Sequence, residues 1–127
     1  YGEPTIRLPQ LLQICRYLKT FQAKVRLNTN GHGSLIWGRN IVPELAGLID
    51  VVSISLNAMD MEQYIKLCQP AHGGTAFEAV LGFAGECKAY VPEVWLTVVD
   101  VISGYEIELC RELAKKLDVH FKVRRCC

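Results

Sequence analysis

Polar and charged side chains follow the apolar runs of this chain at the points where predicted strands end. They are, in chain order, Thr29, Asn30, Ser55, Asn57, Asp100 and Arg124, and Glu3 takes the same place if an apolar strand precedes Tyr1. In parallel α/β folds, ligands bind outside the carboxyl ends of the strands, because loops and helix N-termini converge there. We therefore expect any ligand site at this edge of the sheet. For each position taken alone, a turn or a cap is the competing explanation.

A polar stripe marks one of the predicted strands. Ser53, Ser55 and Asn57 share one face of it, because successive side chains of a strand point to opposite faces. The strand is otherwise apolar enough to be covered on both sides. The stripe therefore indicates a hydrated or ligand-lined face, although Ser53, deeper in the strand, has a backbone hydrogen bond as its alternative role.

The common nucleotide, zinc and nucleophile motifs are absent from the sequence. It contains no GxGxxG loop, no GxxxxGK followed by Ser or Thr, no HExxH and no GxSxG elbow. Of the three histidines, His32 is the best placed to face a site, in a loop that Gly31 and Gly33 open after a strand. Glu3 and Asp100 could act as a general acid and base only where the fold brings them together.

Strands and helices alternate along the chain. Short β-branched or alternating runs predict strands at residues 24–29, 51–57, 94–100 and 119–124. Apolar periodicity and capping boxes predict helices at residues 8–21, 40–48 and 76–90, near Met61, and from Ser103 to Leu117. This alternation favours right-handed βαβ units and a parallel sheet. The fold class is therefore α/β, in a single domain spanning residues 1–127.

The composition limits the classes of partner. Fourteen Lys and Arg against thirteen Asp and Glu give a formal charge of +1 without a long run of either sign, so no nucleic-acid or anionic membrane surface is indicated. No apolar stretch reaches the roughly 20 residues of a membrane helix. We expect a soluble, cytoplasmic protein.

The six cysteines are the remaining reactive groups. Four of them, Cys15, Cys68, Cys87 and Cys110, fall in predicted helices, which favours free buried thiols over a disulfide framework. The adjacent Cys126 and Cys127 match no closed metal-site spacing, even with His120 upstream. We assign no metal ligands within the chain.

Three sequence patterns carry a family resemblance. They are Gly2-Glu3-Pro4-Thr5, Val25 to Gly33 with its Thr-Asn-Gly turn, and Val52 to Ala58, and they are supported by Tyr64-Ile-Lys-Leu-Cys68. In this order they resemble the middle and C-terminal part of a radical S-adenosylmethionine (radical SAM) enzyme core, and are most similar to its TatD-associated branch. The resemblance covers essentially the whole chain.

The resemblance implies a partial (β/α)6 TIM-type barrel and a set of cofactor-binding residues. Gly2 and Glu3 would bind the amino group of S-adenosylmethionine, and Thr29, Asn30, Ser55 and Asn57 would approach its carboxylate and ribose. Carboxylate, hydroxyl and amide groups suit those partners. Residues 99–104 stand where the family backs the adenine, and fit its GxIxGxxE pattern only in part. No catalytic residue is assigned.

The resemblance also implies a [4Fe-4S] cluster, which together with S-adenosylmethionine generates a 5′-deoxyadenosyl radical. The CxxxCxxC loop that holds this cluster is absent from the 127 residues, and we expect it upstream of Tyr1, so that the chain is a truncated, inactive core. The substrate, a small molecule or peptide, cannot be read from the sequence. Exposed strand edges of a partial sheet are expected to support self-association.

Two other interpretations remain open. A degenerate α/β half-barrel without the cluster would be a non-catalytic ligand-binding or interaction module. A (β/α) hydrolase-type barrel would use Glu3 and Asp100 as metal ligands or as an acid and base.

Overall fold

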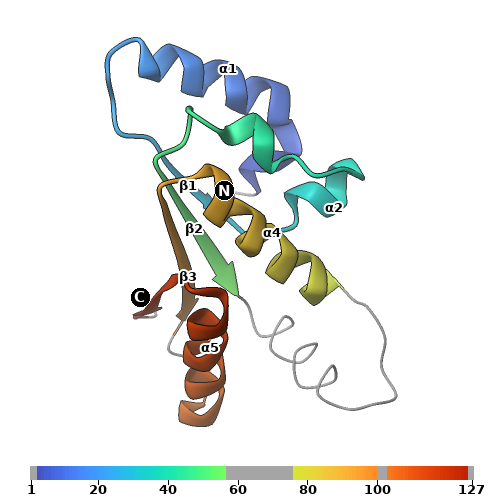
Figure 1. The fold of residues 1–127 in the computed structure, drawn as a ribbon, viewed down its shortest axis with the longest axis vertical. Coiled ribbons are helices and arrows are strands. Elements are labelled where there is room, and N and C mark those ends of the chain that lie inside the picture. Colours follow the sequence, from blue (N-terminus) through green and yellow to red (C-terminus); the bar gives the residue numbers. More distant parts are fainter. Residues whose placement is uncertain (1–2, 57–75, 100–102, 126–127) are drawn as a thin grey trace.

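A four-stranded parallel sheet forms the centre of the molecule (Figure 1). The computed structural model describes residues 3–56, 76–99 and 103–125. The strands are β1 (Arg26–Thr29), β2 (Val51–Leu56), β3 (Glu93–Val99) and β4 (His120–Arg124), and they pair in the order β1-β2-β3-β4. All three pairings are parallel. The predicted α/β class and parallel sheet are confirmed, and each strand lies within two residues of its predicted bounds wherever those bounds are described.

The three longer helices are α1 (Leu8–Lys19), α4 (Ala76–Tyr90) and α5 (Gly104–Leu117). Helix α1 buries Leu8, Leu12 and Cys15 at helical spacing. The predicted capping box opens α5: the Glu106 N–H donates to Ser103 Oγ at 3.1 Å, and the Ser103 N–H donates to Glu106 Oε1 at 3.0 Å. The predicted bounds agree with the structure for α4, and for α5 to within one residue.

The shorter elements correct two predictions. The predicted helix at residues 40–48 is only a 3₁₀ turn, η2 (Val42–Leu45), which has a proline in its first turn and ends before Gly47 at a φ of +76°. The predicted loop after Gly31 contains a short helix, α2 (Gly33–Trp37). A second 3₁₀ turn, η1 (Pro4–Arg7), precedes α1. The helix predicted near Met61 lies outside the described residues.

The two faces of the sheet differ in character. The register assigns ten residues to what we call the packed face: Leu27, Thr29, Val52, Ile54, Leu56, Val94, Leu96, Val98, Phe121 and Val123. The other twelve strand residues form what we call the open face: Arg26, Asn28, Val51, Ser53, Ser55, Glu93, Trp95, Thr97, Val99, His120, Lys122 and Arg124. No packed-face residue is exposed, whereas five open-face residues are, namely Arg26, Asn28, His120, Lys122 and Arg124.

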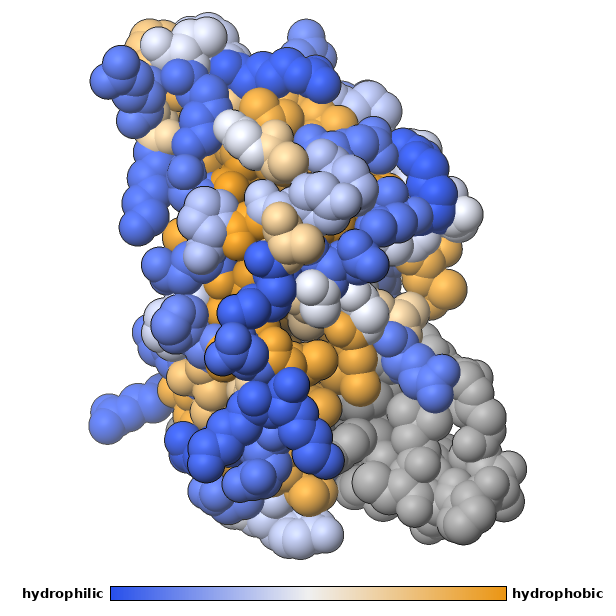
Figure 2. Space-filling view, viewed as in Figure 1, coloured by the Kyte–Doolittle hydropathy of each residue, from blue (hydrophilic) through white to orange (hydrophobic). Residues whose placement is uncertain are grey.

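The strand order explains this difference. The strands follow the chain without reversal, and right-handed crossovers taken in one direction place their helices on one side of a sheet. The crossover elements η2, α4 and α5 accordingly contribute Leu45, Val80 and Leu113 to the same hydrophobic core as the packed face, and α1, which precedes β1, adds Leu12. Figure 2 shows mainly hydrophilic side chains on the face in view, with hydrophobic ones visible between them.

The described cysteines are part of this core. Cys15, Cys87 and Cys110 are buried and take part in no disulfide bond, as predicted. Burial raises the pKa of the Cys87 and Cys110 thiols to about 12, so both remain protonated near neutral pH. Cys68, Cys126 and Cys127 lie outside the described residues. In the part of the chain that the structure describes, no helix is long and apolar enough to cross a lipid bilayer.

Candidate functional site

The carboxylate of Glu3 joins the start of the chain to the carboxyl end of β1. Its Oε2 atom accepts hydrogen bonds from the Thr29 hydroxyl at 2.6 Å, from the Thr5 N–H at 3.1 Å and from the Thr5 hydroxyl. Its Oε1 atom accepts from the Asn30 N–H at 2.7 Å. The structure therefore brings together three of the residues that the sequence analysis selected: Glu3, Thr29 and Asn30.

Thr29 and Asn30 use their side chains to shape the turn that follows β1. The Thr29 hydroxyl accepts from the Gly31 N–H at 3.1 Å, and Asn30 Oδ1 accepts from the His32 N–H at 2.9 Å. Gly31 has a φ of +79°, and a Cβ there would lie 2.9 Å from Cγ1 of Val80. The turn thus needs glycine both for its backbone conformation and for the close approach of α4.

The charge of Glu3 is the most informative property of this cluster. A carboxylate offers about four lone-pair directions, and Glu3 accepts four hydrogen bonds, three of them on Oε2. All four donors are neutral, and among the described residues no ion pair includes Glu3. No described residue neutralises the negative charge, so it can attract a cation. Because Oε1 accepts one hydrogen bond, this oxygen has a lone pair left for such a cation.

A second polar cluster lies on the open face. The Ser55 and Thr97 hydroxyl oxygens are hydrogen-bonded at 3.2 Å. Arg124 reaches from β4 across β3, and its Nη2 donates to Ser55 Oγ at 3.2 Å. Ser55 and Arg124 are among the predicted strand-end residues, whereas Thr97 is not. Thr97 is a polar residue in the apolar run of β3. This pattern points to a contact with Ser55 only once the register Ser55↔Thr97 is known.

The two clusters lie at the same edge of the sheet but on different faces. Thr29 pairs in register with Ile54 on the packed face, and Ser55 is the next residue of β2, on the open face. Gly2, Asn57 and Asp100, which the sequence analysis also named, lie outside the described residues.

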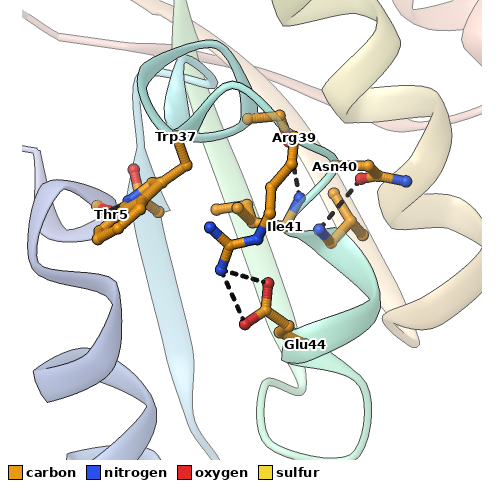
Figure 3. A network of polar contacts seen from close by, with 8 residues as sticks. Thr5, Trp37, Arg39, Asn40, Ile41 and Glu44 are labelled. Carbon is orange, nitrogen blue, oxygen red and sulfur yellow. Dashed lines mark hydrogen bonds and ion pairs between the residues drawn. The ribbon is translucent and has the colours of Figure 1, made fainter.

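Contacts of Trp37 and Arg39, which no sequence pattern indicated, hold Thr5, one of the partners of Glu3 (Figure 3). The Trp37 indole N–H donates to the Thr5 carbonyl oxygen at 2.6 Å. The Arg39 guanidinium lies 5.3 Å from the centre of the Trp37 ring and donates to both carboxylate oxygens of Glu44, at 3.0 and 3.2 Å. Trp37 and Thr5 are 32 residues apart, so no local pattern could have indicated their contact.

These observations define an α/β protein with a one-sided parallel sheet and polar clusters at the carboxyl ends of its strands. Within the described residues, no three His, Cys, Asp or Glu side chains are grouped as metal ligands. The chain matches no protein-family model, and no curated protein or solved structure is significantly similar to it.

Proposed function

We propose that these residues are part of the core of a radical SAM enzyme, which binds S-adenosylmethionine at the carboxyl edge of the sheet. A parallel sheet that follows the chain, with helices on one side, is compatible with a segment of a (β/α) barrel. The observation that carries the proposal is the carboxylate of Glu3, which lies at the end of β1 and has only neutral partners among the described residues.

The described residues suit the polar groups of this cofactor in part. Glu3 can attract an ammonium group, with one acceptor direction left on Oε1. Ser55 presents a half-buried hydroxyl on the open face, which suits a carboxylate or a ribose hydroxyl. The Thr29 hydroxyl is already engaged with Glu3 and Gly31, so its role in the proposal is to position Glu3. Gly2 and Asn57 complete the proposed set from the family resemblance.

The reaction itself belongs to the cofactors. S-adenosylmethionine supplies a radical when a [4Fe-4S] cluster reduces it, and the protein contributes binding and orientation. Cys87 and Cys110 do not suit the cluster, because both side chains are fully buried in the hydrophobic core. The proposal therefore requires a cysteine loop supplied from outside these 127 residues.

Binding of S-adenosylmethionine tests the proposal. Isothermal titration calorimetry on the protein with its complete reading frame would compare the wild type with Glu3→Gln, which removes the charge and keeps the shape. Loss of a charge-assisted contact is expected to weaken binding by about tenfold or more. The control Glu108→Gln removes a carboxylate from the exposed side of α5 and should leave the affinity unchanged. Equal affinity of Glu3→Gln and the wild type would remove Glu3 from the site.

One observation favours a non-catalytic ligand-binding or interaction module as the second candidate. The four internal hydrogen bonds of Glu3 give it a complete structural role without any ligand. The sequence of the reading frame upstream of Tyr1 distinguishes the two candidates. A CxxxCxxC motif there supports the enzyme, and an upstream strand without three cysteines supports the module.

A further inference from the structure

Positive charge collects at the carboxyl half of the open face. Lys122 and Arg124 lie there on β4, and both side chains are exposed. The open face carries one acidic residue, Glu93, at the first position of β3. Among the residues that the structure describes, the two cations therefore have no carboxylate in their own half of this face.

Glu93 is too distant to neutralise them. Arg124 pairs in register with Val99, six residues beyond Glu93, which corresponds to about 20 Å along a strand. Charges on a surface are largely screened beyond about 8 Å at physiological ionic strength. Glu93 also has its own partners: its Oε2 accepts from the Trp95 indole N–H at 2.6 Å. That hydrogen bond, followed by the charges of Lys24, His120 and Arg26, lowers the pKa of Glu93.

Arg124 is held in an orientation suited to binding. Its contact with Ser55 uses one of the five N–H donors of the guanidinium and keeps the side chain over β3. Ser55 is in turn held by Thr97, which is buried and also donates to the Ile54 carbonyl at 3.5 Å. A guanidinium held in this way can give two parallel hydrogen bonds to a carboxylate or phosphate, with the Lys122 ammonium as a second charge two residues earlier on the same face.

We propose that Arg124, with Lys122, binds the anionic group of a small-molecule substrate, a phosphate or a carboxylate, on the open face. That the bound anion is part of a substrate rests on the proposed function. The anion site itself depends only on the residues of the sheet. Ser55 then lies between the substrate anion and the proposed cofactor. Because S-adenosylmethionine also carries a carboxylate, the test must separate these two sources of the anion.

Titration with inorganic phosphate tests the site. We expect saturable shifts of the Ser55, Thr97 and Arg124 backbone amide signals in ¹⁵N spectra of the chain, at ionic strength held constant with chloride. Arg124→Gln should weaken phosphate binding by about tenfold and Lys122→Gln by about threefold, because the first also removes the bidentate donor. The control Lys116→Gln removes the same charge from an exposed position of α5 and should change nothing. Urea unfolding of each variant shows that it remains folded.

The outcomes separate this inference from the proposed function. Phosphate and S-adenosylmethionine that bind together support both. Phosphate binding at Arg124, with no binding of S-adenosylmethionine in the calorimetry described under Proposed function, supports the anion site and removes the radical SAM proposal. Displacement of phosphate by S-adenosylmethionine would assign the site to the cofactor's own carboxylate and overturn the inference. Equal phosphate binding by Arg124→Gln and Lys116→Gln would overturn it as well.

Discussion

Two carboxylates hold the two ends of β1, and they do so with different partners. At the amino end, Asp50 Oδ2 accepts from the Val25 N–H at 2.7 Å and from the Lys19 ammonium at 2.5 Å. At the carboxyl end, Glu3 accepts from the N–H groups of Thr5 and Asn30 and from the hydroxyls of Thr5 and Thr29. Both fix the backbone where a strand meets a loop, but within residues 3–56, 76–99 and 103–125 only Asp50 has a cation beside it.

The difference separates a structural carboxylate from one suited to a ligand. The charge of Asp50 is compensated, so it has little attraction left for another cation. Glu3 has the same kind of backbone contacts, and no described residue compensates its charge, at the edge where parallel α/β sheets bind ligands. The surroundings of the Glu3 partners differ too: Thr5 is fully buried and Thr29 is 4 % exposed, whereas the side chains of Lys19 and Asp50 are 27 % and 31 % exposed.

Removal of each carboxylate gives the largest expected effect. Glu3→Ala leaves the buried donors of Thr5 and Thr29 without an acceptor, and should lower the free energy of unfolding by about 3 kcal/mol. Asp50→Ala exposes its partners to water and should lower it by about 1 kcal/mol. Urea unfolding of the two variants and the wild type measures both values. If Asp50→Ala is the more destabilised variant, the contrast in burial does not govern these two sites.

The fold was predictable because its signals are local. Helix α5 is marked by Ser103 and Glu106 at its start, and β3 by a run of β-branched and aromatic residues, so each follows from a short stretch of sequence. The parallel arrangement follows from the alternation of such elements. The helix predicted at residues 40–48 is wrong, because a 3₁₀ turn rather than an α-helix buries the apolar residues of this segment.

The candidate site was predictable only in outline. Glu3, Thr29 and Asn30, which the structure brings together, are predictable as site residues because each stands at the end of a predicted strand or where one would end. It could not supply the partners, since Trp37 and Thr97 each make contacts with residues more than 30 positions away. It also could not show that Thr29 lies on the packed face and Ser55 on the open face, which depends on register.

The ion pair beside Asp50 gives an intermediate effect that depends on pH. The Lys19 hydrogen bond, followed by the Val25 N–H, lowers the pKa of Asp50 below its ordinary value of 3.8. A carboxyl group with a lowered folded-state pKa contributes stability above its unfolded-state pKa, and loses this contribution as the pH falls through the folded-state value. The difference in unfolding free energy between the wild type and Asp50→Asn should therefore be constant from neutral pH to about pH 5 and shrink below pH 3.8.

A double-mutant cycle checks the cause of that dependence. Lys19→Gln should destabilise the wild type but add little to Asp50→Asn, because the partner is already neutral. Urea unfolding of the wild type, the two single variants and the double variant across the pH series gives the four free energies of unfolding that the cycle compares. Full additivity of the two substitutions would show that Lys19 and Asp50 are not coupled, and the cation would no longer distinguish Asp50 from Glu3.

The two tryptophans give the smallest and most selective test, because each donates one indole hydrogen bond of 2.6 Å on a different side of the molecule. Trp37→Phe leaves the buried Thr5 carbonyl without its donor, and should cost about 1 kcal/mol of unfolding free energy. Trp95→Phe should cost less, because water can replace the indole at Glu93. Its effect is instead electrostatic: without the N–H, the pKa of Glu93 rises toward its ordinary value.

Urea unfolding and an NMR titration of the Glu93 carboxyl measure the two effects in the same pair of variants. Trp37→Phe should leave the pKa of Glu93 unchanged, since the indole of Trp37 hydrogen-bonds to Thr5 and not to the open face. Equal losses of stability in the two variants would mean that the open face is as closed to water as the loop around Glu3. That result would argue against the open face as the side of the sheet on which a ligand binds.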